Sequence, residues 1–460
     1  MSALRIQALL TLTVAWLVGC GPTPPPAVEP TPPVPSVPAP EDPAPITDGD
    51  VTVAYENGLR IVVKRNVGSE IAAMQLYIKG GARFRTKDNA GAELLALRVA
   101  TRGGTTELDK DAFTKRLTAM GSHLGASGLH GYSVIAAASL TEQIDDTFAL
   151  LASAFLSPAM PESEIEQVRQ AQLVGIKRRE VTPDGRLSLL VRDAMYRGHP
   201  YENLPDGTVE SVSSLSRASL MAHLQTLRVT SRLQLVVVGD VEADRVRQLV
   251  RTSFGKLPRG DYQAPPLPRP AFAQPKLSVT AAELPTNYIQ ASFIGPGWSD
   301  PDFAAGILAM KILHNRVWEE VRTKRNLSYA PAARYSYSGE ITRGALYVTA
   351  VDANAAMAVM LEEAKLLESE PIRPKTLTGT KSIFLTGHLM GNESTHGQAE
   401  WLAICDIVGG DWKLSRDLPK RIAALTVEDL QAFARKRLRN LQTVVLGDPT
   451  KLDQKLLESL

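Results

Sequence analysis

The stretch NAGAELLALRVATRGGT, at positions 89–105, decides how the rest of this chain is interpreted. Its apolar residues recur at i, i+3, i+4 and i+7, the spacing of one face of an α-helix: Ala92, Leu95, Ala96 and Val99. Gly103 and Gly104 follow this face and favour a helix end, because glycine readily takes the backbone conformations that terminate helices. The stretch therefore predicts a short helix with one side in a hydrophobic core.

The composition places the chain among globular proteins. At 460 residues it is long enough for two to four domains, and its 44% hydrophobic and 22% charged residues are ordinary values for a folded protein. A formal net charge of +2 gives no reason to expect nucleic acid as a partner. The two cysteines, Cys20 and Cys405, have neither the number of a disulfide framework nor the spacing of a metal site.

The N-terminus has the pattern of a targeting segment. Arg5 is followed by an apolar run at positions 6–18 that is too short to span a bilayer comfortably. The ending LVGC resembles a bacterial lipobox, which implies that residues 1–19 are a lipoprotein signal peptide and that Cys20 carries lipid. Gly21, where an aspartate retains lipoproteins at the inner membrane, then implies the outer membrane, facing the periplasm. An ordinary signal peptide with a chance cysteine is the alternative.

Residues 20–48 are predicted to be a proline-rich linker. Twelve prolines lie between Pro22 and Pro45, interleaved with alanine, valine, threonine and glutamate. Such a segment favours extended polyproline II structure and cannot bury a core, so we interpret it as a stiff spacer between the lipid anchor and the folded body. A ligand motif for a proline-binding domain is the alternative.

Two similar halves follow, at residues 49–256 and 276–460, with a second proline-rich linker at 257–275 between them. Each half ends in a helix, a short link and a buried strand closed by Gly-Asp: LQLVVVGD ends at Asp240, and LQTVVLGD ends at Asp448. Two matching units about 200 residues apart indicate a duplicated domain, because solenoid repeats have periods of roughly 20–50 residues.

Strands and helices in both halves predict an α+β sandwich in each, with helices over one sheet face. The first half opens with a predicted hairpin that turns at Asn57-Gly58. We expect a strand at 71–79, a long helix at 162–181 and a helix at 214–227 to follow. In the second half we expect strands at 333–337 and 346–351, and then helices from 355 to 435, broken near Pro371 and Pro374.

Four segments resemble the insulinase-like (M16, pitrilysin) zinc metallopeptidases. They are N-G-L-x-hydrophobic at Asn57–Val63, A-x-Y-x-x-H-P-Y at Ala194–Tyr201, V-R-x-K-x-x-L-x-Y at Val321–Tyr329, and the helix at 89–105, which is similar to the family's G-x-A-H-x-x-E-H-x-x-x-x-G-T. The likeness covers nearly everything from Val51 to Asp448. It implies two homologous M16-type (LuxS/MPP-like) α/β sandwich domains in tandem.

The chain departs from the family at every zinc position. In the family two histidines of H-x-x-E-H and a glutamate on the long helix hold zinc, and the glutamate of the motif activates water. The matching positions here are Glu93 and Leu97 for the histidines, Ala96 for the base, and Gly175 for the third ligand. Because catalytic zinc needs three protein ligands, we predict no metal in this chain and no peptide hydrolysis by the chain alone.

One functional element of the family is present. The resemblance implies that the second half contributes an arginine and a tyrosine, seven residues apart, which hold the substrate backbone and help to polarise the scissile carbonyl. Arg322 and Tyr329 match that spacing. The structural alternative is that Arg322 caps or ion-pairs its own helix and that Tyr329 begins a strand.

These patterns favour a non-catalytic subunit that supplies Arg322 and Tyr329 to a zinc-bearing M16 homologue with H-x-x-E-H. The expected heterodimer cleaves peptides or unfolded polypeptides in the bacterial cell envelope, and zinc is expected only in the partner chain. The alternative is a pseudopeptidase scaffold or binding module of an envelope complex, similar to the non-catalytic M16-like core subunits of a respiratory complex. Weak metallopeptidase activity from an unrecognised site is a third hypothesis.

Overall fold

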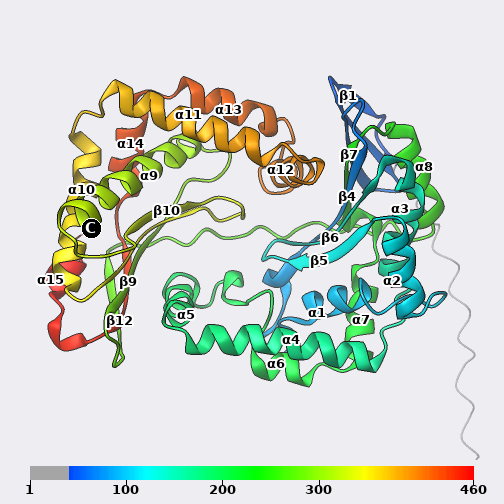
Figure 1. Cartoon of the computed structure of the whole chain (residues 1–460), viewed down its shortest axis with the longest axis horizontal. Coiled ribbons are helices and arrows are strands. Elements are labelled where there is room, and N and C mark those ends of the chain that lie inside the picture. Colours follow the sequence, from blue (N-terminus) through cyan, green and yellow to red (C-terminus); the bar gives the residue numbers. More distant parts are fainter. Residues whose placement is uncertain (1–40, 460) are drawn as a thin grey trace, which may run out of the picture. The chain divides into compact units, whose positions relative to one another are not determined.

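Two β-sheets, one in each half of the chain, organise the fold (Figure 1). The computed structural model describes residues 41–459, which belong to one contiguous unit. The predicted signal peptide (1–19), the lipid-attachment residue Cys20 and most of the predicted linker (20–48) lie outside the described residues.

The first sheet has seven strands in the order β1-β2-β3-β7-β4-β6-β5. They are β1 (Ile46–Asp48), β2 (Val51–Glu56), β3 (Leu59–Arg65), β4 (Ile71–Lys79), β5 (His123–Gly128), β6 (Tyr132–Leu140) and β7 (Leu233–Gly239). The predicted hairpin joins β2 to β3, and Asn57 and Gly58 have the positive φ values, 48° and 81°, that such a tight turn requires. The short strand β1, which lies in the predicted linker segment, pairs with β2 at the edge of the sheet.

Within the described residues the first half has eight α-helices, and all of them except α5 lie on one side of this sheet. They are α1 (Ala92–Ala100), α2 (Lys110–Ala119), α3 (Ile144–Leu156), α4 (Glu162–Val181), α5 (Pro183–Tyr196), α6 (Val209–Ser214), α7 (Arg217–Leu227) and α8 (Ala243–Phe254). The helix predicted at 214–227 is wrong at its start, because α6 ends at Ser214 and α7 is a separate helix. The side chain of Ser216 accepts a hydrogen bond from the backbone N–H of Ser219, a capping box that starts a new helix.

The second half has five strands in the order β10-β11-β9-β12-β8. They are β8 (Lys276–Ala281), β9 (Asn287–Ile294), β10 (Ala332–Ser336), β11 (Arg343–Ala350) and β12 (Gln442–Gly447). The helices are α9 (Phe303–Val317), α10 (Ala353–Ser369), α11 (Pro374–Gly391), α12 (Thr395–Ile407), α13 (Leu414–Ala424), α14 (Val427–Arg437) and α15 (Gln454–Leu457). A π-helical segment, Trp318–Lys324, continues α9.

Each sheet buries its second face against a helix from the other half of the chain. Helix α12 of the second half packs on β4 and β7, while α5 of the first half packs on β9 and β12 (Figure 1). Side chains alternate between the two faces: in β7, Leu235 and Val237 join the core under the first half's own helices, whereas Val236 packs in the cluster that contains Leu402 of α12. The sequence predicted helices on one face of each sheet only. The other face of each sheet is covered by the helix from the opposite half, α12 or α5.

Polar contacts accompany this exchange. Arg60 of β3 donates two hydrogen bonds to Asp406 of α12, with nitrogen–oxygen distances of 2.7 and 2.9 Å. On the other side, the hydroxyl of Tyr347 in β11 donates to Asp184 of α5 at 2.5 Å. Because only 4% of the Asp406 side chain is exposed, its pairing with Arg60 is required to offset the cost of burying the charge.

Candidate functional site

Glu93, at the first family histidine position, is a buried carboxylate in the first turn of α1, 4% exposed. Ser133 Oγ of β6 donates a hydrogen bond to Glu93 Oε1 at 2.5 Å, and His223 Nε2 of α7 lies 3.2 Å from Glu93 Oε2. Both carboxylate oxygens are therefore occupied by side chains of this chain.

The hydrogen bonds of His223 define its tautomer. Arg85 Nη1 lies 3.0 Å from His223 Nδ1, and a guanidinium can only donate, so Nδ1 accepts and Nε2 carries the proton donated to Glu93. Burial opposes ionisation of Glu93, but the hydrogen bonds from His223 and Ser133 and the charge of Arg85 outweigh it. The pKa of the Glu93 carboxyl therefore lies below its ordinary value.

The residues at the family's zinc positions do not fit a zinc ion. Ala96 and Leu97 are fully buried in the hydrophobic core of the first half and have no donor atom. Between residues 41 and 459 no cluster of three histidine, cysteine, aspartate or glutamate side chains is arranged to hold a metal. A carboxylate with two hydrogen-bonded oxygens and two aliphatic side chains cannot supply the three ligands that catalytic zinc needs.

Gly175, at the third ligand position, lies on an exposed part of α4. A Cβ atom built there meets nothing within 4 Å, so the glycine is not required by packing. Gln172, three residues before Gly175, is buried, and its Nε2 donates to the carbonyl of Asp206 at 2.9 Å. The Gln172 amide N–H thus ties α4 to a neighbouring loop.

Arg322 and Tyr329 contact each other in the second half. The guanidinium carbon of Arg322 lies 4.1 Å from the centroid of the Tyr329 ring and 4.3 Å from that of Trp318, so the cation is held between two aromatic rings. Tyr329 is 79% exposed, and both Arg322 and Tyr329 line a cavity of about 580 Å³. Across the described part of the chain, no hydrogen bond, ion pair or ring contact links this pair to Glu93.

Four residues of these sites were missed from the sequence. Ser133 and His223 lie 40 and 130 positions from Glu93 in the chain, and single residues at such separations leave no spacing signal. Arg85 lies nearer in the chain, in a loop, but it contacts His223 and not Glu93. Trp318 lies four residues before Arg322, a helical i, i+4 spacing that a search for an aromatic partner would have found.

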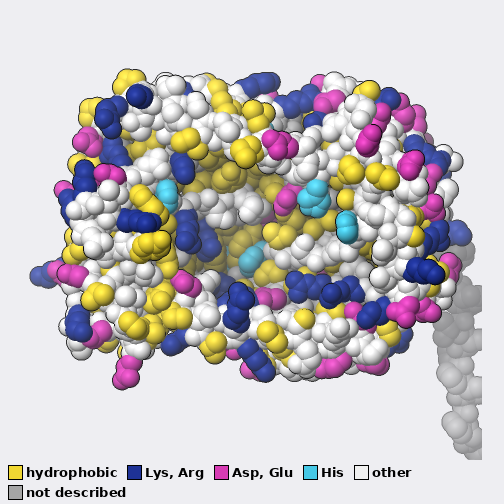
Figure 2. All heavy atoms as spheres, in the orientation of Figure 1, with side chains coloured by type: hydrophobic (Ala, Val, Ile, Leu, Met, Phe, Trp, Pro, Cys, Tyr) yellow, Lys and Arg dark blue, Asp and Glu magenta, His cyan; other side chains and the backbone are white. Residues whose placement is uncertain are grey.

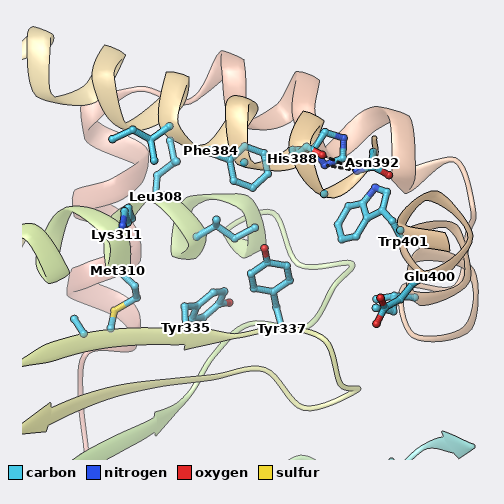
Figure 3. A pocket seen from close by; sticks show the side chains of 17 residues that line it. Leu308, Met310, Lys311, Tyr335, Tyr337, Phe384, His388, Asn392, Glu400 and Trp401 are labelled. Atoms are coloured by element: carbon cyan, nitrogen blue, oxygen red, sulfur yellow. Dashed lines mark hydrogen bonds between the residues drawn. The ribbon is translucent and has the colours of Figure 1, made fainter. Parts of the chain in front are cut away.

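A further cavity, of about 500 Å³, lies in the second half between α9, β10, α11 and α12 (Figure 3). Its walls are largely aromatic, with Tyr335 and Tyr337 on one side and Phe384, His388 and Trp401 on the other (Figure 3). Lys311 and Glu400 are the charged residues in its lining. Such a lining suits an apolar group with a few polar atoms.

The face drawn in Figure 2 is hollowed near its centre, with hydrophobic, basic and histidine side chains around the hollow.

No helix within residues 41–459 combines the length and apolar character that crossing a membrane requires. Three curated relatives are similar to parts of this chain, with 21% to 24% identity in the aligned regions. An uncharacterized zinc protease of Mycobacterium leprae is 23% identical over 72% of this chain and 77% of its own length. Mitochondrial-processing peptidase subunit beta of Saccharomyces cerevisiae is 21% identical over 72% of this chain and 76% of its own. Human cytochrome b-c1 complex subunit 1 is 24% identical over 44% of this chain and 42% of its own length.

Two solved structures share the fold. A peptidase M16 inactive domain from Pseudomonas fluorescens has a TM-score of 0.77 at 19% identity, over 86% of this chain and 98% of its own. The periplasmic protease PqqL from Escherichia coli has a TM-score of 0.75 at 14% identity, over 89% of this chain and 46% of its own. Among family profiles, the insulinase family (peptidase family M16) matches residues 60–205, and the peptidase M16 inactive domain matches residues 214–384. The chain therefore belongs to peptidase family M16, as an inactive-type member with two M16 domains in tandem.

Proposed function

We propose that this protein is the non-catalytic subunit of a two-chain M16 peptidase and that it supplies Arg322 and Tyr329 to the active site of a zinc-bearing M16 partner. The observation that carries the proposal is the contrast between the two halves. The α1 positions offer no zinc ligand set, whereas Arg322 is stacked against an exposed Tyr329 beside a cavity.

The surroundings of Arg322 argue against a role confined to its own helix. Glu320, a carboxylate of the same helical segment, pairs with Lys324 at 2.6 Å and with Arg325. Within residues 41–459 Arg322 has no ion pair, so its guanidinium N–H groups keep their capacity to bind a carbonyl oxygen. The two rings fix the plane of the guanidinium, which reduces the entropy that binding a peptide backbone would cost.

The relatives support a paired subunit in the cell envelope. Mitochondrial-processing peptidase subunit beta is named as one subunit of a peptidase, and PqqL is named as periplasmic. We propose by analogy a heterodimer with an H-x-x-E-H homologue, with zinc in that partner only, acting on peptides or unfolded polypeptides. Lipid on Cys20 would place the complex at the outer membrane, facing the periplasm.

Co-expression with an H-x-x-E-H homologue encoded nearby tests this function. The mixed complex should cleave a fluorogenic peptide, and Tyr329→Phe should reduce kcat by roughly a hundredfold, because one group that polarises the carbonyl is removed. Arg322→Ala should also reduce the kcat of the mixed complex. Arg325→Ala is the matched control, since Arg325 is exposed and pairs with Glu320. Unchanged cleavage by both the Arg322 and Tyr329 variants would rule out the proposed role.

A scaffold or binding module is the second candidate, and helix α11 favours it. Thr380 is the one buried residue among its 18, and Ile383, Leu389 and Met390 are each more than half exposed. Exposed apolar side chains next to an aromatic cavity are typical of a surface that binds another protein. Affinity purification from the native membrane separates the candidates: a peptidase subunit supports the first, and an assembly without one supports the second.

A further inference from the structure

A second set of charged residues lies at the junction of the two halves, around a cavity of about 380 Å³. Its lining includes two cations, Arg60 and Lys79, and two carboxylates, Glu340 and Asp406. This cavity shares no lining residue with the one beside Arg322 and Tyr329.

The charges around this junction cavity do not balance. Arg60 pairs with Asp406 at 2.7 Å, and Glu340 pairs with Arg83 at 2.9 Å, so these two pairs cancel. Lys79 Nζ has no hydrogen bond or ion pair within the described part of the chain. Burial and the charge of Arg60 lower the pKa of Lys79, and the charge of Asp406 opposes them only in part.

A buried guanidinium adds to this excess of positive charge. Arg232 is 7% exposed, and its nitrogens bond backbone carbonyls, those of Lys79 at 2.6 Å and Thr226 at 3.5 Å, rather than a carboxylate. It stacks over the ring of Tyr262, 4.8 Å from the centroid. The Tyr262 hydroxyl is buried and has no hydrogen-bond partner. Buried cations and donors without partners carry a free-energy cost that an anion removes.

Two glycines allow these groups to approach. Gly80 has a φ of 128°, and a Cβ atom there would lie 2.3 Å from Arg232 Nη2. A Cβ atom at Gly131 would lie 2.5 Å from Glu340 Oε2. Both glycines line the cavity, so the backbone itself leaves room for the charged side chains.

We propose that the junction cavity binds an oxyanion, either a free phosphate or a carboxylate, through the ammonium group of Lys79 and the hydroxyl of Tyr262. Arg232, behind the Tyr262 ring, adds positive potential. The bound oxyanion bridges Lys79 of the first half and Tyr262 of the inter-domain segment, next to Glu340 of the second half, and so stabilises the contact between the halves.

Thermal unfolding of the purified full chain at constant ionic strength tests this site. Inorganic phosphate, tri-alanine with a free carboxylate, and tri-alanine amide are the probes. The expected result is a saturable rise in Tm with phosphate or free tri-alanine, and none with the amide. A rise with phosphate alone identifies free phosphate as the ligand, and a rise with tri-alanine alone identifies a carboxylate.

Lys79→Met keeps most of the side-chain volume and should weaken binding about tenfold or more, as expected when a charge-assisted hydrogen bond is lost. Lys115→Met, at an exposed lysine of α2, is the matched control and should bind as the unmodified chain does. Tyr262→Phe removes one hydroxyl and should weaken binding severalfold, which keeps the test valid if Lys79→Met does not fold. The proposal is overturned if no probe raises Tm, or if neither variant weakens binding.

Discussion

His223 Nε2 lies 3.2 Å from Glu93 Oε2, and the two residues come from helices separated by 130 positions in the chain. We expect from the sequence resemblance that Glu93 matches a zinc-ligand position of M16 peptidases, and its carboxylate is a hydrogen-bond acceptor inside the domain. Ser133 donates a second hydrogen bond to Glu93, and Arg85 donates to His223. Glu93, Ala96 and Leu97 are all buried, so we expect them to contribute to stability.

Glu93→Ala should lower the free energy of unfolding by about 3 kcal/mol, because it leaves the Ser133 hydroxyl and the His223 N–H buried without an acceptor. Urea unfolding followed by circular dichroism measures this change. Glu180→Ala, at an exposed position of α4, is the control and should change stability by about 0.5 kcal/mol or less. Equal effects of the two substitutions would contradict the assigned role of Glu93.

The stabilisation by Glu93 should depend on pH. Its folded-state pKa lies below the ordinary value of about 4.3, so its ionised form stabilises the fold above that pH and loses this effect as the pH falls through the folded pKa. The difference in unfolding free energy between the unmodified chain and Glu93→Gln should therefore be constant above about pH 5 and shrink below about pH 4.3. If the difference in unfolding free energy between the two chains grew as the pH fell, the pKa of Glu93 would be raised in the folded state, not lowered.

His130 should contribute a separate pH dependence. Burial, with the charges of Arg192 and Arg343, lowers its pKa from 6.5 to about 4. The unfolded chain therefore takes up a proton first, and stability should decline as the pH falls from about 6.5 to about 4, by up to about 3 kcal/mol. His130→Gln should reduce this decline. An NMR titration that finds His130 protonated at pH 6 would contradict this prediction.

Asp406→Ala should destabilise the protein by about 3–5 kcal/mol, because it leaves Arg60 without its partner at the junction of the halves. The substitution also removes the acceptor for Gln234 Nε2, which lies 2.8 Å from Asp406 Oδ2. Asp417→Ala removes an exposed pair with Lys420 and should cost about 0.5 kcal/mol. Chemical unfolding compares the two variants, and similar midpoints would contradict a structural role for the Arg60–Asp406 pair.

The sequence alone determined the family and several of the elements. The long helix α4 and the strand β4 have the bounds expected from apolar periodicity, and the Asn57-Gly58 turn forms as predicted. These features depend on neighbouring residues, whose side-chain spacing and backbone preferences are local properties. The replacements at Ala96 and Leu97 were visible for the same reason, since one short helix carries them both.

Only the tertiary structure decided which helix covers which sheet and which side chains surround Glu93. Helices α5 and α12 each pack on the sheet of the opposite half, a pairing that the sequence analysis did not predict. The partners of Glu93 come from separate elements, so their meeting depends on how the sheet and helices pack. The stacking of Trp318 on Arg322 and the unpaired Lys79 arise in the same way, because packing in three dimensions fixes contacts that no spacing in the chain specifies.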